Sequence, residues 1–368
     1  MSGRIGRRLS GRRLARESNA GFIAASIAGA GLLILCGCGG ANESDGGPVS
    51  MDIVEPPLVV ATRLHARSEW TVADTFAFFR ATDLLLLEDD ILVGDSGNDR
   101  LVLFDEELVP LRTIGREGAG PGELRQPFRI RAGGRFLVAS ELGNSRFSFF
   151  HRDGTFSHVV PRLGLEGVFD LTSDGSVYRA SMADGHYLFR VGSGGDTASI
   201  APIPAEVRAL RKPGADAPRW RSDLVVATEG DTLHVFDNQV GALIKLDPGG
   251  RVHAVRTLPE TLRRGALEKS ENLHRSLSDA GHRVLASPLA AHLSVTGEGD
   301  LFLRLTYERV VGLLIDPHSY SVRFVYVPAA TGDWAPVSQS LAAAVRDSTL
   351  FVLGTDGIAS FRLREESN

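Results

Sequence analysis

The strongest constraint on the fold of this chain is one repeated pattern: a short apolar segment, a tight polar turn and a second apolar segment. Alternating or continuous apolar residues around Asp, Gly, Glu or Ser are typical of two antiparallel strands that reverse in a tight turn. The pattern occurs at 84–94, 128–140, 169–181, 223–237, 292–305 and 342–354. These six segments predict six β-hairpins rather than helices.

A third strand follows the hairpins and carries a recurring pair of polar residues. A shift of 46 residues places Asn144 over Asn98 and Arg146 over Arg100. We expect the asparagine to shape the turn and the arginine to brace neighbouring strands, rather than these side chains to line a binding face. Repeats of roughly 40 to 50 residues with about four strands each are typical of propeller blades. The predicted fold is therefore all-β, a six-bladed β-propeller over residues 52–368.

Two segments interrupt the regular spacing of the repeats. Apolar residues at helical intervals among charged residues predict a short helical insertion at 257–285, between blades 4 and 5. The segment 202–220, rich in Pro and Ala, is expected to be a smaller loop insertion. We also expect a strand near 59–64 or 71–79 to pair with the last blade, because closing the ring removes open sheet edges.

One junction between repeats supports a family resemblance. The segment 104–130 contains a Gly-x-Gly-Pro-Gly-Glu turn followed by a proline, and the matching residues are Gly118, Gly120, Pro121, Gly122, Glu123 and Pro127. This segment resembles NHL-type repeats and the six-bladed propeller lipoproteins of environmental bacteria. The match is specific at this junction, recognisable in a second blade, and covers roughly 300 residues as a repeat pattern.

The first 37 residues have the layout of an export signal. Six arginines and one acidic residue precede an uncharged run from Gly21 to Leu35, which is too short for a stable membrane span. The end of this run, Leu35–Cys38, resembles the lipobox of bacterial lipoproteins, and Cys38 takes the position that is lipidated. A plain cleaved signal with incidental cysteines is the alternative.

The chain is accordingly predicted to have three parts. Residues 1–37 are a lipoprotein signal peptide, 38–51 a flexible tether rich in Gly, Ser and Pro, and 52–368 the propeller. The predicted location is the bacterial cell envelope, where the protein is exported and held by a lipid anchor. Gly39 after the lipidated cysteine favours the outer membrane or the periplasmic face. The export route, Sec or Tat, stays open.

Charge and cysteine content exclude several classes of function. Removing residues 1–37 takes six of the 40 basic and one of the 45 acidic residues, which leaves a net charge of −10. So acidic a body is unsuited to nucleic acid, whose affinity comes largely from neutralising phosphates. Because no cysteine follows Cys38, the mature body has no disulfide, no thiolate metal site and no cysteine nucleophile.

The motifs that resemble known chemistry are weak. The string Gly94-Asp95-Ser96-Gly97 resembles the nucleophile segment of serine proteases, but it has no His-containing partner segment, and we interpret it as coincidence. Oxygen ligands suited to calcium occur nearby without the spacing of an EF-hand, at Asp89, Asp90, Asp95, Asn98 and Asp99. No cofactor is therefore expected, with calcium as the minor alternative.

The ten histidines are scattered singly through the repeats and contain no His-Glu-x-x-His or His-x-His pair. Single strand histidines such as His234 and His292 are expected at surface positions or at core positions with satisfied hydrogen bonds. The spacing leaves open a metal or acid/base site assembled from several blades at the ring axis.

The function predicted first is a non-catalytic binding or scaffolding propeller, displayed on the envelope by its lipid anchor, with an envelope protein, peptide or glycan as partner. No catalytic residue is assigned. The alternative is a metal-dependent propeller hydrolase or lyase of the lactonase type, with its site at the central channel. That alternative requires Glu, Asn and Asp, or several His, on the innermost strands, and the sequence does not reveal such a set. A third hypothesis is a structural role as a subunit of a larger envelope complex.

Overall fold

The structure is a computed structural model in which residues Gly47–Asn368 form one compact unit. It describes residues 48–68, 78–162, 168–180, 185–192, 196–211, 224–265, 268, 289–305, 310–327, 341–354 and 357–366. The predicted signal peptide, Cys38 and most of the predicted tether lie outside the described residues. Within these ranges we find no helix with the length and apolar character that a membrane crossing requires.

Four sheets of the ring are separate antiparallel meanders in chain order. The first comprises β4 (Ala81–Leu86), β5 (Ile91–Asp95), β6 (Arg100–Phe104) and β7 (Pro110–Ile114). The second comprises β8 (Pro127–Gly133), β9 (Phe136–Glu141), β10 (Arg146–His151) and β11 (Phe156–Pro161). The third comprises β12 (Phe169–Leu171), β13 (Val177–Ala180), β14 (Leu188–Val191) and β15 (Thr197–Ser199). The fourth comprises β16 (Leu224–Glu229), β17 (Thr232–Asp237), β18 (Ala242–Leu246) and β19 (Val252–Thr257), with β1 (Val49–Ser50) added parallel to β19.

The remaining strands belong to one nine-stranded sheet. It contains β20 (Ala290–Val295), β21 (Leu301–Leu305), β22 (Val310–Ile315), β23 (Ser321–Tyr326), β3 (Leu58–Ser68), β26 (Gly357–Glu365), β25 (Thr349–Gly354) and β24 (Ala342–Arg346), while β2 (Asp52–Ile53) pairs with β23. All six predicted hairpins are antiparallel strand pairs, so this part of the sequence-based prediction is confirmed.

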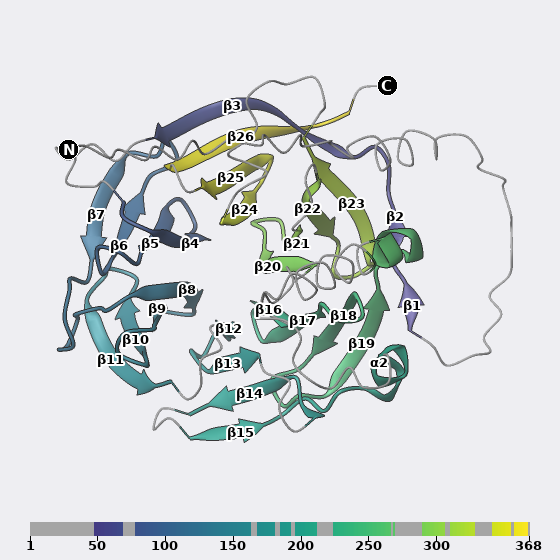
Figure 1. Ribbon diagram of the computed structural model, residues 1–368, viewed down its shortest axis with the longest axis horizontal. Coiled ribbons are helices and arrows are strands. Elements are labelled where there is room, and N and C mark those ends of the chain that lie inside the picture. Colours follow the sequence, from purple (N-terminus) through teal and green to yellow (C-terminus); the bar gives the residue numbers. More distant parts are fainter. Residues whose placement is uncertain are drawn as a thin grey trace, which may run out of the picture. The chain divides into compact units, whose positions relative to one another are not determined.

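The sheets are arranged as a propeller-like ring around a common axis (Figure 1). The first strand of each hairpin faces the axis and contacts its counterpart in the next hairpin, in the order β4, β8, β12, β16, β20, β24 and back to β4. The fold is therefore all-β and propeller-like, as the repeat pattern predicts. Inner strands that are neighbours around the axis therefore bring together residues that are far apart in the sequence.

The ring is closed by the strand predicted near 59–64. β3 pairs antiparallel with β26, the last strand of the chain, from Gly357 opposite Ser68 to Glu365 opposite Leu58. This pairing confirms one of the two predicted closures, and it protects the edges that an open ring would expose. Most of the other candidate segment, 71–79, lies outside the described residues.

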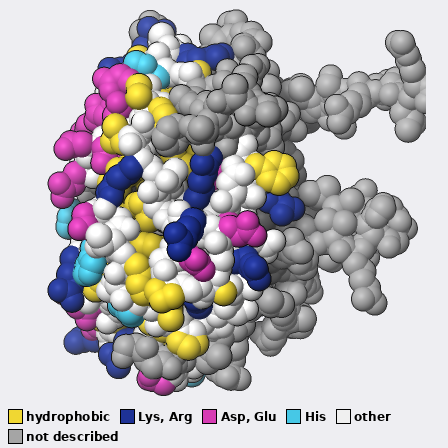
Figure 2. All heavy atoms as spheres, turned by 90° about the vertical axis from the view of Figure 1, so that its left-hand side faces the viewer, with side chains coloured by type: hydrophobic (Ala, Val, Ile, Leu, Met, Phe, Trp, Pro, Cys, Tyr) yellow, Lys and Arg dark blue, Asp and Glu magenta, His cyan; other side chains and the backbone are white. Residues whose placement is uncertain are grey.

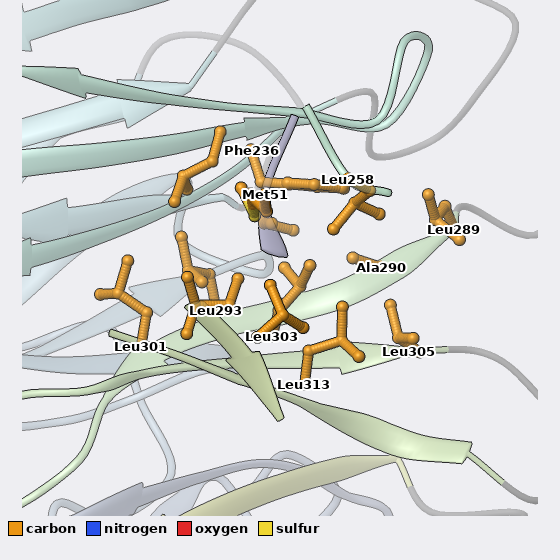
Figure 3. Close-up of a cluster of buried hydrophobic side chains, with 14 of the residues drawn as sticks. Met51, Phe236, Leu258, Leu289, Ala290, Leu293, Leu301, Leu303, Leu305 and Leu313 are labelled. Carbon is orange, nitrogen blue, oxygen red and sulfur yellow. The ribbon is translucent and has the colours of Figure 1, made fainter. Parts of the chain in front are cut away.

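Neighbouring sheets pack face to face through apolar side chains. Between the fourth sheet and β20–β22, Phe236 and Leu258 face Leu293 and Leu303, and Met51 from the N-terminal segment fills the space between them (Figure 3). All of these side chains are buried. Burial of apolar surface contributes about 25 cal/mol per Å². Met51 therefore belongs to this core, next to the predicted start of the propeller at residue 52.

The inserted segments are partly helical. The predicted insertion at 257–285 contains helical residues at 260–265, and most of the remainder lies outside the described residues. The segment 202–220, predicted to be a loop, contains the short helix α2 (Ala205–Leu210). Val207 of α2 is buried against the third and fourth sheets, and this tertiary contact stabilises a helix too short to be recognised by its periodicity.

Candidate functional site

The recurring turn residues form closed polar groups. In the first sheet the buried carboxylate of Asp95 accepts hydrogen bonds from Asn98 Nδ2 at 2.7 Å, Arg100 Nε at 3.0 Å and the backbone N of Phe79 at 2.8 Å. Burial raises the pKa of Asp95, although these hydrogen bonds oppose the increase. Because the acceptors are occupied by local donors, this group organises the turn.

The second sheet repeats this arrangement around Glu141. Its carboxylate accepts from Arg146 Nε at 2.8 Å, Asn144 Nδ2 at 2.5 Å, the backbone N of Arg125 at 2.7 Å and Ser148 Oγ. Arg146 also donates to carbonyl groups in the Gly-rich junction between the first two sheets. These contacts agree with the structural interpretation of the Asn and Arg pairs and not with a binding face.

Asp95 and Asn98 contact each other, but the five oxygen ligands considered for calcium do not form one group. Asp89 and Asp90 precede β5, whereas Asp95, Asn98 and Asp99 lie at or beyond its opposite end. Asp99 Oδ1 accepts a hydrogen bond from the backbone N of Gln126 at 2.5 Å, so it caps a turn. Within the described ranges, no three His, Cys, Asp or Glu side chains are grouped closely enough to hold a metal ion.

His234 and His292 both lie in the core and not on the surface, and among the described residues their hydrogen bonding is incomplete, contrary to the expectation of satisfied core positions. His234 Nε2 lies 3.3 Å from Glu229 Oε2, and burial lowers the pKa of this histidine despite the glutamate. The Nδ1 atoms of both rings are buried without a hydrogen-bond partner in the described structure. His292, on the inner strand β20, is part of a larger group of charges.

Asp83 on β4 is the centre of that group. Its fully buried carboxylate accepts from Arg131 Nη1 at 2.8 Å, Arg129 Nη1 at 3.3 Å and the backbone N of Ile130 at 3.0 Å. Burial alone would raise the pKa of Asp83, but the two guanidinium groups outweigh it and hold the pKa below its usual value. Asp83 is therefore ionised and joins β4 to β8 of the next sheet.

His292 belongs to the same group of interacting charges. It interacts electrostatically with Arg131, Asp83 and Arg129, although β20 does not neighbour β4 or β8 in the ring. Burial, reinforced by Arg131, lowers the pKa of His292 to about 3. The imidazole is therefore neutral at physiological pH and can donate one hydrogen bond.

Asp170 on β12 is the second carboxylate at the axis. Oδ2 accepts from the backbone N of Thr228 on β16 at 2.8 Å, and Oδ1 accepts from that of Leu171 at 2.9 Å. Burial raises the pKa of Asp170 to about 6, against the opposing effect of Arg131. Asp170 thus joins two inner strands as Asp83 does. Its carboxylate is protonated more readily than that of Asp83, because its pKa is raised and that of Asp83 is lowered.

Arg304 completes what we call the axis cluster, which is defined as Asp83, Arg129, Arg131, Asp170, His292 and Arg304. Arg304 lies opposite His292 in the strand ladder and donates from Nη1 to the carbonyl of Val311 at 3.1 Å. Burial lowers its pKa to about 10, so it remains charged at neutral pH. Three guanidinium groups therefore share the axis cluster with two carboxylates and a neutral imidazole.

Three members of the axis cluster occupy equivalent positions in different sheets. Each directly follows an irregularity in the pairing of its inner strand, between Ala81 and Asp83, between Pro127 and Arg129, and between Ala290 and His292. Such irregularities redirect side chains. In each case a buried apolar residue comes next, namely Leu84, Ile130 and Leu293.

Alignment of the hairpins contains the signal that would have located this site. A polar residue precedes a core residue at the same point of three inner strands that are otherwise mostly apolar. Sequence reasoning missed it because the members are Asp, Arg and His, and only the three-dimensional equivalence unites them. The set differs from the Glu, Asn and Asp expected for a lactonase-type metal site.

Comparisons with known proteins support the fold and leave the function open. No protein family and no curated protein matches the sequence. An exported protein from Bacteroides fragilis has a similar structure, with a TM-score of 0.54 and 12% identity over 87% of this chain and 99% of that chain. A gluconolactonase from Xanthomonas campestris has a TM-score of 0.46 and 13% identity, covering 88% and 100%. Virginiamycin B lyase from Staphylococcus aureus has a TM-score of 0.43 and 12% identity, covering 77% and 80%. At these identities the similarity concerns the fold alone.

Proposed function

We propose that this chain is an exported, lipid-anchored β-propeller of six blades that binds an envelope peptide or glycan at its ring axis without chemical turnover. One observation carries the proposal: the axis cluster is a buried, charged group whose members come from five strands. The buried carboxylates of Asp95 and Glu141 accept hydrogen bonds from local donors in turns. In the axis cluster, by contrast, Arg131 Nε and His292 Nδ1 have no hydrogen-bond partner in the described structure. Convergent polar groups with perturbed pKa values are typical of binding sites.

Six blades follow if the nine-stranded sheet is counted as two units. β20–β23 form one meander, and β24–β26 with β3 form the other. Among the described residues, their ladder contacts are Val325 opposite Leu58 and Tyr326 opposite Val59, at one end of β3. The circle of six inner strands supports the same count.

The lipid anchor is supported by the basic N-terminal region, the apolar run that follows it and the Leu35–Cys38 segment. The variant Cys38→Ser is expected to abolish incorporation of labelled fatty acid and to shift the protein from the membrane to the soluble fraction. The matched variant Cys36→Ala should retain both the label and membrane attachment. Label retained by Cys38→Ser would contradict the proposed anchor.

The metal-dependent alternative fits the described axis residues poorly. Asp83 is occupied by two guanidinium groups and a backbone amide, and Asp170 by two backbone amides. Three arginines share the axis with these carboxylates, and their positive charge opposes a divalent cation. Binding without a metal is the function that this set of residues supports best.

The test uses the full-length protein extracted in detergent. Elemental analysis is combined with thermal-shift measurements against envelope peptides, glycans and lactones, because a specific ligand raises the apparent stability by mass action. We expect a saturable shift with one ligand class and no loss of that ligand over time. A stoichiometric divalent metal together with hydrolysis or elimination of a substrate would overturn the binding function in favour of the hydrolase or lyase.

A further inference from the structure

Two exposed positions at the rim of the ring are built in the same way in neighbouring sheets. The backbone N of Phe79 donates to the turn carboxylate of Asp95 at 2.8 Å, and the backbone N of Arg125 donates to that of Glu141 at 2.7 Å. Phe79 and Arg125 are 46 positions apart, which is the shift that superposes the turns of the first two sheets. Both therefore lie where an inner strand begins, ahead of β4 and β8.

Glycines of the same two turns support the side chains of these residues. A Cβ atom at Gly97 would overlap the Phe79 ring, and one at Gly143 would overlap the side-chain methylenes of Arg125. Phe79 is nevertheless 68% exposed, and Arg125 is exposed as well. A side chain that already lies against the backbone loses less conformational entropy when a partner binds it. Both positions thus display an ordered side chain to solvent.

The two positions flank a single turn and therefore lie near each other. Phe79 packs on the turn between β5 and β6. In the same turn, Asp99 Oδ1 accepts from the backbone N of Gln126, which follows Arg125. Leu142, which is 36% exposed, lies beside them, because its backbone N donates to the carbonyl of Gln126 at 3.0 Å. Aromatic, aliphatic and basic side chains are thus combined on one surface.

Four residues form what we call the rim patch: Phe79, Arg80, Arg125 and Leu142. Arg80 and Arg125 are both exposed, and neither forms an ion pair with another residue that the structure describes. The neighbouring carboxylates of Asp95 and Glu141 are already paired with arginines of their own turns. The rim patch therefore offers two unpaired positive charges beside apolar surface.

The opposite face of the ring carries the opposite charge. It is formed by the turns of the six inner hairpins, and neighbouring turns contact one another there. Arg346 Nη1 donates to the carbonyls of Leu87 and Glu88 at 2.9 and 2.8 Å, and Ser173 Oγ donates to Asp231 at 2.6 Å. Five of the six turns contain carboxylates, namely Glu88, Asp89, Asp90, Asp174, Asp231, Glu298, Asp300 and Asp347. Acidic side chains line one edge of the view in Figure 2. An acidic partner is thus repelled by that face and attracted to the rim patch.

We infer that the rim patch docks an acidic polypeptide segment, with an apolar side chain of the partner against Phe79 and Leu142 and its carboxylates near Arg80 and Arg125. Aromatic residues and arginine dominate the binding energy of protein interfaces, and the guanidinium fork matches a carboxylate. The inference rests on the proposed binding function and names the class of partner and the surface that receives it.

The experiment selects peptides from a random library displayed on phage, with the detergent-extracted full-length protein as bait. A parallel selection uses the double variant Phe79→Ala, Arg125→Gln. Because the hydrogen bonds to the turns come from the backbone of both residues, the double variant should keep the unfolding temperature of the unaltered protein. We expect the unaltered protein, and not the double variant, to enrich peptides that combine Asp or Glu with large apolar residues.

Calorimetry with one enriched peptide then measures the two side chains separately. Phe79→Ala should weaken binding about thirtyfold, as truncation of a central interface residue does. Arg125→Gln should weaken it about tenfold, with a smaller effect at high salt. Leu111→Ala and Arg251→Gln are the matched controls, since both alter exposed residues outside the rim patch, and they should bind like the unaltered protein.

Three outcomes would overturn the rim patch and leave the proposed binding function standing. The first is that the unaltered protein enriches no peptide relative to the double variant. The second is that it enriches basic peptides, which would place docking on the acidic face. The third is that an enriched peptide binds Phe79→Ala and Arg125→Gln normally but loses affinity for His292→Leu. Cleavage of a bound peptide would instead contradict binding without turnover and retain the rim patch.

Discussion

A buried carboxylate that accepts hydrogen bonds from arginine occurs both in the turns, at Asp95 and Glu141, and at the axis, at Asp83. The two regions differ in where the hydrogen-bond donors come from. In both turns a buried carboxylate is surrounded by donors from its own hairpin or the adjoining junction, and these contacts fix the local backbone. At the axis, Asp83 orients two arginines from the next sheet, and donors on Arg131 and His292 remain unused in the described structure. The turn groups are thus satisfied within one sheet and its adjoining junction, whereas the axis cluster joins residues of several sheets.

The outer surface provides a second contrast with the axis. On the side of the ring that carries β7 and β11, hydrophobic, acidic and basic side chains are interspersed (Figure 2). The exposed hydrophobic residues there include Leu111 and Val159, which belong to the two outer strands.

The largest expected effect is the acid sensitivity that His292 contributes. Its pKa is about 3 in the folded protein and about 6.5 when unfolded, so the unfolded chain binds a proton first as the pH falls. Its contribution to stability is present above pH 6.5 and is lost towards pH 3, a difference of up to about 5 kcal/mol. Urea unfolding of the unaltered protein and of His292→Leu from pH 7 to pH 3.5 measures this effect. Equal pH dependence of the two proteins would show that His292 is not buried as described.

The next largest effect is expected in the turn of the second sheet. Glu141→Ala removes the acceptor of four donors and leaves Arg146 partly buried without its carboxylate, which should lower the free energy of unfolding by about 4 kcal/mol. The neighbouring Ser140→Ala is the matched control, because Ser140 Oγ is buried with no partner in the described part of the chain. It should change stability by less than about 0.5 kcal/mol. Chemical denaturation of both variants tests the structural role of Glu141. An unchanged free energy of unfolding in Glu141→Ala would contradict that role.

Asp170 is expected to act in the opposite direction to His292. Its folded pKa of about 6 lies above the unfolded value of 3.8, so the folded state retains a proton that the unfolded state has lost. The resulting stability is fully present below pH 3.8 and is lost as the pH rises through 6, a difference of about 3 kcal/mol. Asp170→Asn should therefore flatten the stability profile between pH 4 and pH 6.5. A profile unchanged from that of the unaltered protein would contradict the raised pKa.

The smallest expected effect concerns an exposed ion pair. Arg116 Nη2 lies 3.2 Å from Glu123 Oε1, and the arginine side chain is 81% exposed. Solvent and salt screen such a pair, so Arg116→Gln should change the free energy of unfolding by less than about 0.5 kcal/mol. If Arg116→Gln lowered the free energy of unfolding as much as Glu141→Ala does, the exposure of an ion pair would not predict its contribution to stability.

Most of the fold was predictable because its determinants are local. Each hairpin depends on apolar segments of strand length and on a turn of Asp, Gly, Glu or Ser, all within about 15 residues. The closing strand near 59–64 was predictable because a ring needs a partner for its last blade. The helix α2 was not, because six residues are too few for a periodic signal and packing of Val207 stabilises it. Lipidation of Cys38 stays a prediction.

The amino-acid sequence by itself determined the repeated hairpins, the turn groups and the apolar inner strands, since all of these arise from neighbouring residues. Only the tertiary structure decided that Asp83 pairs with Arg131 and that His292 interacts electrostatically with both. They are separated by up to 209 residues, from position 83 to position 292, and no local pattern states which inner strands face one another across a ring. Ring closure brings them together, and burial then changes their pKa values and leaves the donors from which a binding site is inferred.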